Sequence, residues 1–234
     1  MAKVLVIVPT YNERGNILSI VPELIEHIKG VHILVVDDNS PDKTASAVRD
    51  LQTNFSQVHL LERLQKEGLG RAYVDGFYWA IKNNYDIIVQ MDADHSHRVQ
   101  DLKKMLGELT ANIDFVIGSR WVTGGLIRNW DRLRWILSRF GNIYAQCILG
   151  GKIADWTGGF NIWRAKILQK IDLQTLEAQG YAFQIEMKYR ALRLNFCGIE
   201  VPIVFEERRL GQSKMSLAII SEALIRVWYL KSKF

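Results

Sequence analysis

Two acidic residues, Asp92 and Asp94, directly follow an apolar run from Ile87 to Met91. Such a run is typical of a buried strand, and residues two apart on a strand point to the same face. Two carboxylates at the carboxyl end of a parallel strand can hold a divalent cation, because hard cations prefer oxygen ligands. The alternative is a turn without a ligand, since Asp is also a common turn residue. The metal site is therefore a hypothesis that other segments must support.

Polar groups also follow the first two predicted strands. The turn from Pro9 to Glu13 offers the Tyr11 ring for stacking on a base and the Glu13 carboxylate for a base edge or a ribose. It lacks the Gly-x-Gly-x-x-Gly pattern of dinucleotide-binding proteins, which argues against NAD or FAD. The second strand ends on Asp37 and Asp38, where an acid commonly binds ribose hydroxyls. Two adjacent acids repel each other, so a ligand or hydrogen-bond donors must compensate.

Basic residues concentrate in the second half of the chain. From Arg120 to Lys152 there are six basic residues and one acid, and six of the seven tryptophans lie at or beyond residue 121. This composition predicts contact with a polyanion or an anionic membrane, whereas the alternative is a solvated helix face. Five cations, three of them just after predicted strand ends, favour a phosphate site. They are Arg120, Arg134, Arg139, Arg208 and Lys214.

The composition is that of a soluble globular protein, with 48% hydrophobic and 24% charged residues among 234 and a net charge of +5. Cys147 and Cys197 form no disulfide framework, and no Cys or Glu-His spacing completes a zinc site around His95 and His97. The sequence contains no uninterrupted run of about 18 apolar residues, so no transmembrane helix is expected. The N-terminal apolar run stops at Pro9, so it is interpreted as a strand and not as a signal peptide.

Strand and helix patterns alternate over the first 120 residues, which predicts βαβ units and a mostly parallel α/β sheet. The expected strands cover residues 3–8, 32–36, 58–61, 86–91 and 114–118, and the expected helices cover 15–27, 41–52, 69–83 and 99–110. The second helix is expected to begin with Ser40 as its cap and Pro41 at its first position.

The second half is less regular. The expected elements are a helix over 131–149, a Gly-rich turn over 155–159, a strand over 160–164, a helix over 183–194, a strand over 199–205 and a last helix over 217–230. The apolar face of the helix over 131–149 is expected either to meet membrane headgroups or to pack in the core. With the residue just before the helix, that face comprises Trp130, Trp135, Ile136, Leu137, Phe140 and Ile143.

Several ordered motifs resemble those of the inverting nucleotide-sugar transferases with the GT-A fold. They are Val8–Glu13, Val36–Asp42, Met91–Asp94 and Gly118–Arg120. Later motifs are similar to those of the polyprenol-phosphate (dolichol-phosphate) mannosyltransferases within that family: Asn129-Trp130, Ser138-Arg139, Asp155–Phe160, Tyr181–Met187, Glu200–Ile203 and the segment from Arg208 to Lys214. The resemblance covers nearly the whole chain, from Val4 to Lys214, and implies a GT-A-type α/β fold with C-terminal interfacial helices.

The resemblance implies transfer of mannose from GDP-mannose to a polyprenyl (dolichyl) monophosphate, with inversion and with Mg²⁺ or Mn²⁺ as cofactor. It assigns donor binding to Pro9, Tyr11, Glu13, Val36, Asp38, Asp92, Ala93, Asp94, Arg208 and Lys214. It places the metal at Asp92 and Asp94 and the acceptor phosphate at Arg120, Arg134 and Ser138, and Asp92, Asp94 and Arg120 are the implied catalytic residues. Residues 1–234 are expected to form one catalytic domain, with a nucleotide-sugar half (1–120) and an acceptor half (121–234).

The chain departs from the family pattern at His95, Val99 and Trp156, and Ser96 stands where a polar neighbour of the metal is expected. Two alternatives stay open. One is a UDP-glucose or other nucleotide-sugar transferase acting on undecaprenyl phosphate or another acceptor. The other is a nucleotide- or nucleic-acid-binding module, although the acid clusters would repel nucleic acid phosphates. We expect a peripheral protein on the cytoplasmic face of a membrane, held by the lipid surface or by a membrane-embedded partner subunit.

Overall fold

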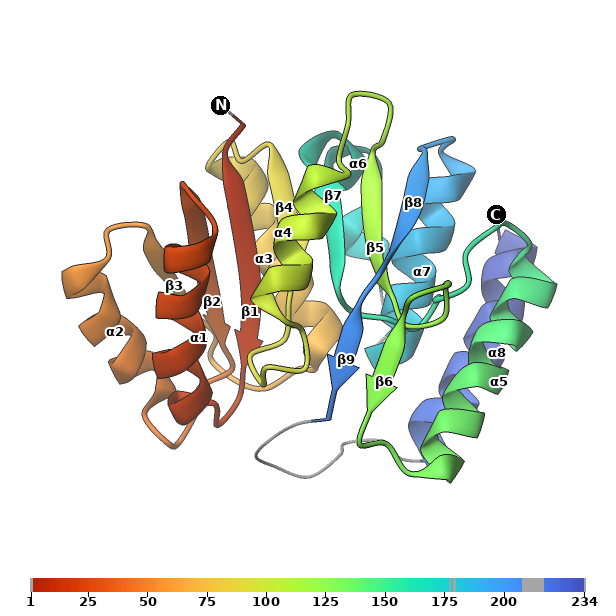
Figure 1. The fold of residues 1–234 in the computed structure, drawn as a ribbon, viewed down its shortest axis with the longest axis horizontal. Coiled ribbons are helices and arrows are strands. Elements are labelled where there is room, and N and C mark those ends of the chain that lie inside the picture. The colour runs from red at the N-terminus through yellow and green to blue at the C-terminus, as the bar shows by residue number, and fades with distance from the viewer. Residues whose placement is uncertain (1, 177, 179, 208–216, 234) are drawn as a thin grey trace.

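The computed structural model describes residues 2–176, 178, 180–207 and 217–233. A seven-stranded sheet has the order β3-β2-β1-β4-β7-β5-β8. Its strands are β1 (Val4–Thr10), β2 (Val31–Asp37), β3 (Val58–Glu62), β4 (Ile87–Gln90), β5 (Phe115–Ser119), β7 (Asn161–Arg164) and β8 (Gly198–Pro202). All of them run parallel except β7, which lies antiparallel between β4 and β5. A strand from the second half of the chain is thus inserted between two strands of the first half (Figure 1).

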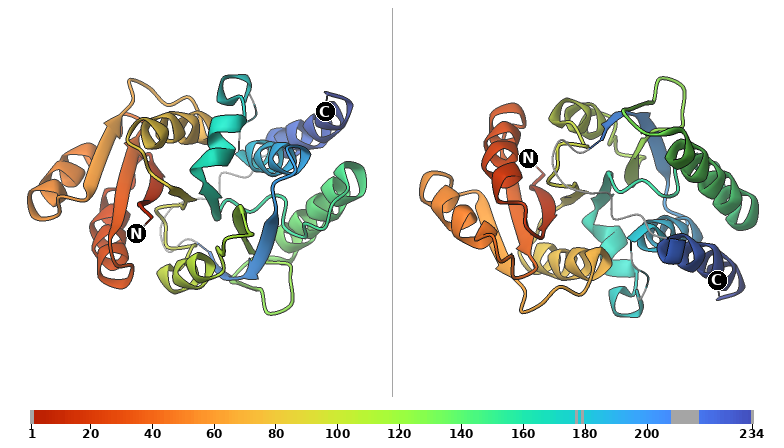
Figure 2. Two further views of the ribbon diagram at one scale, coloured as in Figure 1. Left: turned by 90° about the horizontal axis from the view of Figure 1, so that it is seen from above. Right: turned by 90° about the horizontal axis from the view of Figure 1, so that it is seen from below.

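Helices cover both faces of the sheet (Figures 1 and 2). One face is covered by α1 (Arg14–His27), α2 (Thr44–Asn54) and α4 (Val99–Gly107), and the other by α3 (Leu69–Lys82), α6 (Ala165–Lys170) and α7 (Gly180–Arg193). A short 3₁₀ helix, Leu173–Thr175, connects α6 to α7. Beyond β8, α5 (Arg132–Leu149) and α8 (Leu217–Lys233) lie side by side. Two hydrophobic cores result, one on each face of the sheet.

The central strands are buried on both faces, which explains their continuous apolar sequences. Leu5, Val6, Ile7 and Val8 of β1 are all fully buried, and they alternate between the two cores. Gly76 lets α3 approach the sheet closely, because a Cβ atom there would lie 2.8 Å from Ile7 Cγ2.

The expected α/β class and mostly parallel sheet are confirmed, and every strand and helix expected in the first 120 residues is present. One helix start was predicted wrongly, because α2 begins at Thr44 and not at Pro41. The Ser40 hydroxyl and backbone N–H donate to the Asp37 carboxylate at 2.6 and 2.9 Å, which ties this residue to the end of β2. Asp42 instead accepts the Thr44 backbone N–H at the helix start.

The strand expected over 199–205 is divided into two elements. After β8 ends at Pro202, the Ile203 N–H donates to the Ser119 carbonyl, and the chain continues as β9 (Val204–Glu206). β9 pairs in parallel with β6 (Leu126–Arg128) in a separate two-stranded sheet. The break follows from proline, which has no N–H with which to continue a strand ladder. The helices expected in the second half are present.

No helix within the described residues combines the length and the apolar character needed to cross a membrane.

Candidate active site

The predicted site residues gather where the parallel strands end. β1, β2, β4 and β5 end at Thr10, Asp37, Gln90 and Ser119, and all four strands run in the same direction. The acid pairs that follow β2 and β4 and the arginine that follows β5 therefore share one edge of the sheet. Because β7 runs in the opposite direction, the segment that leads into it reaches the same edge.

Asp37 and Asp38 are both buried, and separate donors compensate the two carboxylates. The Thr10 and Ser40 hydroxyls donate to Asp37 Oδ1 at 2.8 and 2.6 Å. Arg63 Nη1 donates to Asp38 Oδ1 at 2.5 Å. Burial raises the pKa of Asp38, and the Arg63 charge and hydrogen bond only partly oppose that effect. The protein itself thus supplies donors against the repulsion of the adjacent acids.

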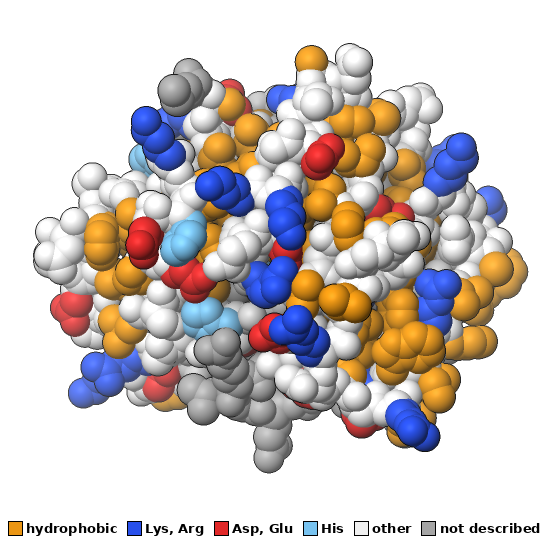
Figure 3. All heavy atoms as spheres, in the orientation of Figure 1, with side chains coloured by type: hydrophobic (Ala, Val, Ile, Leu, Met, Phe, Trp, Pro, Cys, Tyr) orange, Lys and Arg blue, Asp and Glu red, His pale blue; other side chains and the backbone are white. Residues whose placement is uncertain are grey.

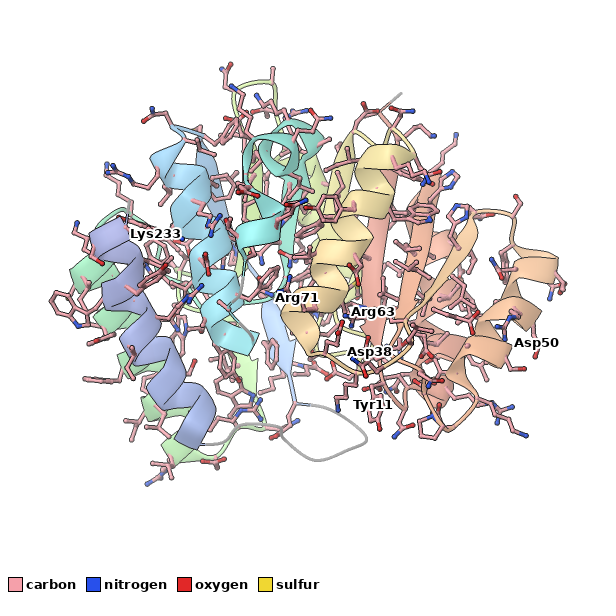
Figure 4. All side chains as sticks on the ribbon, turned by 180° about the vertical axis from the view of Figure 1, so that it is seen from behind. Tyr11, Asp38, Asp50, Arg63, Arg71 and Lys233 are labelled. Atoms are coloured by element: carbon pink, nitrogen blue, oxygen red, sulfur yellow. The ribbon has the colours of Figure 1, made fainter. Side chains whose placement is uncertain are left out.

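Arg63 is a site residue that the sequence analysis missed. Its guanidinium also donates to Glu67 at 2.6 Å and to Asp75 at 2.7 Å, so three carboxylates hold it in place. Figure 4 shows Arg63 beside Asp38, and Tyr11 just beyond the end of β1. The available signal was its position two residues after the end of the third predicted strand, since site residues also follow the ends of the other strands.

The other donor-binding residues expected on β1 and β2 differ in exposure. Pro9, Tyr11 and Glu13 are half-buried, and the Lys66 ammonium lies 3.8 Å from the centre of the Tyr11 ring. Val36 is fully buried, and its side chain faces α3. Val36 therefore packs in the core and anchors the end of β2, from which Asp37 and Asp38 project.

Asp92 and Asp94 follow β4 as predicted. Asp94 is buried, and its Oδ1 accepts the Ser96 hydroxyl at 2.6 Å and the Ser96 backbone N–H at 3.1 Å. Asp92 is half-buried, and Ala93 between them is buried. Ser96, which stands where a polar neighbour of the metal is expected, thus orients the Asp94 carboxylate.

The two histidines that flank the acids have structural partners. His95 has a positive φ of 61°, which turns its ring toward α1, where Nε2 lies 2.7 Å from the Ser19 hydroxyl. His97 is buried and stacks on Phe160, and its Nδ1 accepts the Asp92 backbone N–H at 3.1 Å. Burial lowers the pKa of His97, although both nearby carboxylates act to raise it.

Tyr73 of α3 lies beneath the acid pair and was not expected from the sequence. It is fully buried, and burial together with the charges of Asp92 and Asp94 raises its pKa well above the usual value. A neutral hydroxyl therefore stays beside the carboxylates at any physiological pH. Its sequence context, an apolar helix face, carried no signal for this role.

Arg120 follows β5 and forms a buried ion pair with Asp155. Its Nε and Nη2 donate to the two carboxylate oxygens at 2.8 and 2.7 Å, and its backbone N–H donates at 2.9 Å. Nη2 also donates to the Thr157 hydroxyl at 2.9 Å. Burial acts to raise the pKa of Asp155, but the Arg120 charge and hydrogen bonds hold it below its usual range. Asp155 is thus the partner that orients Arg120, a role that its motif alone did not reveal.

Trp130 brings Arg120 and Arg134 together. The Trp130 ring lies 5.4 Å from the Arg120 guanidinium carbon and 4.2 Å from that of Arg134. Arg134 Nη1 also donates to Glu207 at 2.6 Å. Ser138 lies one turn further along α5, and its carbonyl accepts Asn142 Nδ2. The three residues expected at an acceptor phosphate thus come from neighbouring elements, whereas Arg208 and Lys214 lie outside the described residues.

The donor set at Asp92 and Asp94 consists of oxygen atoms. No group of three or more His, Cys, Asp or Glu side chains is arranged around a common point in the described part of the chain. Two carboxylates fit Mg²⁺ or Mn²⁺, since such ions complete their coordination with water and ligand phosphates. Zinc normally needs three or four protein ligands, which this set does not provide.

Comparisons with known proteins give a matching family and several similar proteins. The profile of the family described as Glycosyl transferase family 2 matches residues 5–172. A polyprenol monophosphomannose synthase from Mycolicibacterium smegmatis is 45% identical over 226 residues, covering 96% of this chain and 85% of that protein. An undecaprenyl-phosphate mannosyltransferase from Micrococcus luteus is 42% identical over 234 residues, covering 99% of this chain and 96% of that protein.

The fold is also similar to a solved structure. Glucosyl-3-phosphoglycerate synthase from Mycobacterium tuberculosis, in complex with Mn²⁺, uridine diphosphate and glucosyl-3-phosphoglycerate, superposes with a TM-score of 0.74 at 18% identity. The match covers 100% of this chain and 81% of that chain. At this identity the likeness concerns the fold.

Replacing Arg63 should destabilise the protein strongly. In Arg63→Met the buried Asp38 carboxylate loses its ion-pair partner, so we expect the free energy of unfolding to fall by about 3 kcal/mol. Arg49→Met is the matched control, because its ion pair with Glu62 is exposed and should contribute less than about 1 kcal/mol. Urea unfolding of both variants at pH 7 measures the difference, and equal losses would contradict the role of Arg63.

Proposed function

This chain belongs to glycosyl transferase family 2, and from that premise we propose that it transfers mannose from GDP-mannose to a polyprenyl (dolichyl) monophosphate with inversion. The observation that carries the proposal is the placement of an acid pair, Asp92 and Asp94, beside a cluster of arginines at one edge of the sheet. Support comes from the two relatives described above, at 45% and 42% identity, whose names both describe mannosyl transfer to a polyprenyl phosphate.

The edge near β1 and β2 is proposed to hold the donor nucleoside. Pro9, Tyr11 and Glu13 provide an accessible turn, and Asp38, oriented by Arg63, provides a carboxylate for the ribose or the base. Arg208 and Lys214 are proposed to contact the donor phosphates.

Asp92 and Asp94 are proposed to hold Mg²⁺ or Mn²⁺ together with the donor diphosphate. When bound, the ion would offset the negative charge that develops on the leaving nucleoside diphosphate. The chain contributes orientation, because Ser96 fixes one oxygen of Asp94 and leaves the carboxylate little freedom to rotate. The neutral Tyr73 hydroxyl adds a dipole beside the acids without adding charge.

Arg120, Arg134 and Ser138 are proposed to orient the acceptor phosphate. The second ionisation of a phosphate monoester lies near pH 6, so the nucleophile is already largely a dianion at pH 7. A strong general base is therefore unnecessary, and catalysis consists of positioning and charge stabilisation. Arg120 suits this task because Asp155 holds two of its nitrogens. Attack from the arginine side on a donor anchored at the acid pair gives a single displacement with inversion.

A donor panel tests the proposal. Purified protein should form labelled mannosyl-lipid from GDP-mannose and dolichyl phosphate in the presence of Mg²⁺ or Mn²⁺. UDP-glucose is the second candidate donor, favoured by the similar structures that contain UDP-glucose and Mn²⁺. Faster transfer from UDP-glucose than from GDP-mannose would replace the first proposal by the second.

Replacing Asp94 should remove transfer while the fold is retained. Asp94→Asn keeps the side-chain shape but loses the charge that holds the cation, so we expect kcat to fall by at least about 100-fold. Asp50→Asn on the outer surface of α2 is the control and should keep normal turnover (Figure 4). Product formation at saturating donor and acceptor is the measurement, and near-normal turnover of Asp94→Asn would refute the metal site.

We further propose that α5 and α8 rest on a membrane surface. Large hydrophobic side chains on α5 are exposed, among them Leu133 at 66%, Ile136 at 57% and Phe140 at 60%. Ile225 and Trp228 of α8 are 72% and 60% exposed. These apolar side chains therefore do not pack in the core, and Figure 3 shows hydrophobic and basic side chains intermingled over α5. Amphipathic helices of this composition bind anionic headgroups.

Substitution of this apolar surface should weaken vesicle binding. We expect the double variant Trp135→Ser, Phe140→Ser to float with anionic phospholipid vesicles at least about tenfold less than the parent protein, because it loses buried apolar area. Leu64→Ser, at a 94% exposed position after β3, is the matched control and should not change flotation. Failure of the parent protein to bind vesicles of any composition would instead favour a partner subunit.

A further inference from the structure

Lys188 of α7 is a fully buried charged residue that the proposed mechanism does not use. Its Nζ donates to the backbone carbonyls of Asp155, Trp156 and Gly158 at 2.8, 3.1 and 2.8 Å. An ammonium has three donor hydrogens, so these three carbonyls use all of them. A lysine is almost never fully buried unless its charge is paired or hydrogen-bonded, and here the segment before β7 provides the partners.

The same segment is also held by the half-buried side chain of Glu200 and the buried side chain of Asn142. Glu200 of β8 accepts the backbone N–H groups of Ala154 and Asp155 at 2.7 and 2.8 Å. Asn142 of α5 accepts those of Trp156 and Thr157 at 2.7 and 3.1 Å. Lys188 therefore binds the carbonyl side of a segment whose N–H groups are bound from two other elements. Because Asp155 is part of this segment, its carboxylate is fixed against Arg120.

The charges that act on Lys188 are those of Arg120, Asp155 and Glu200. When Lys188 is protonated, two cations therefore face two carboxylates. Loss of the Lys188 proton would leave one negative charge in excess beside the guanidinium proposed to meet a phosphate dianion. It would also remove one of the three hydrogen bonds to the segment.

We infer that Lys188 is a positioning residue for the acceptor phosphate: by holding the segment from Asp155 to Gly158 it fixes the carboxylate that orients Arg120. The inference rests on the proposed function in one respect, namely that Arg120 meets a phosphate. Beyond that function, the inference assigns a role to Lys188, which supports the Arg120–Asp155 ion pair without contacting the substrate.

The protonation of Lys188 makes this support dependent on pH. Burial lowers the pKa of Lys188 to about 7, an effect to which Arg120 adds and which Asp155 and Glu200 oppose. The charged, three-donor form is therefore present below pH 7 and is lost as the pH rises. The acceptor phosphate changes in the opposite sense, since it gains its second charge near pH 6. Above pH 7 the charge of the acceptor phosphate hardly changes, so a change in its affinity reflects a change in the charge of the protein.

The test is the dissociation constant of farnesyl phosphate, a short isoprenyl monophosphate, measured by calorimetry from pH 7 to pH 9.5. In the parent protein we expect affinity to fall about tenfold over this range as Lys188 loses its charge. Lys188→Met should bind about tenfold more weakly at pH 7 and show no further loss at higher pH. Lys103→Met, an exposed lysine of α4, is the matched control and should reproduce the parent profile.

An affinity of Lys188→Met equal to that of the parent protein at pH 7 would overturn the inference, and an affinity that is independent of pH in the parent protein would overturn its pH dependence. Thermal unfolding of each variant checks the fold, and Lys188→Arg, which stays charged throughout, replaces Lys188→Met if the latter does not fold. The affinity of Lys188→Arg for farnesyl phosphate should not fall between pH 7 and 9.5. The assay contains no donor, so a protein that binds farnesyl phosphate in this Lys188-dependent way but transfers no sugar would refute the proposed function and leave the inference intact.

Discussion

The buried ion pair between Arg120 and Asp155 is the interaction on which the site depends. It joins the end of β5 to the segment that leads into β7, and these two segments are 35 residues apart in the chain. Taking two charges out of water is costly, so such a pair persists only when further hydrogen bonds satisfy both partners. Here Thr157 serves the guanidinium, and the Gly158 N–H serves the carboxylate. The result is a guanidinium with a fixed direction.

The insertion of β7 between β4 and β5 makes this pair possible. In a wholly parallel sheet, a strand enters at the edge opposite to the one where ligands bind. Because β7 is antiparallel, the Gly-rich segment before it reaches the ligand edge and places Asp155 there. Acids from the first half of the chain and arginines of the second half then lie at one edge. Each charge that would be unfavourable alone has a partner: Arg63 for Asp38, Ser96 for Asp94, and Asp155 for Arg120.

Two surfaces of different character meet in this arrangement. The edge formed by β1, β2 and β4 is rich in carboxylates with polar neighbours, as a nucleotide and a cation require. The side formed by α5 and α8 exposes aromatic and aliphatic groups among arginines and lysines. Trp130 lies at the boundary, against both Arg120 and Arg134. A substrate with an anionic head and an apolar tail would find both of its parts matched across this boundary.

Local patterns in the sequence were sufficient for most of the elements, although not for β6, for α6 or for the division of β8 from β9. They were also sufficient for the positions of Asp38, Asp92, Asp94 and Arg120, because buried parallel strands are continuous apolar runs and ligand-binding side chains follow their ends. The start of α2 was misjudged, since the side-chain hydrogen bonds of Asp37 override the local preference of Ser40 and Pro41 for a helix start. The sequence did not reveal the partners Arg63, Tyr73, Asp155 and Lys188. Arg63 lies 25 residues from Asp38, Asp155 lies 35 residues from Arg120, and Lys188 lies 33 residues from Asp155, whereas Tyr73 belongs to α3. Only the tertiary structure decided which charge meets which, because burial and distance in space, not spacing along the chain, set the energy of an ion pair.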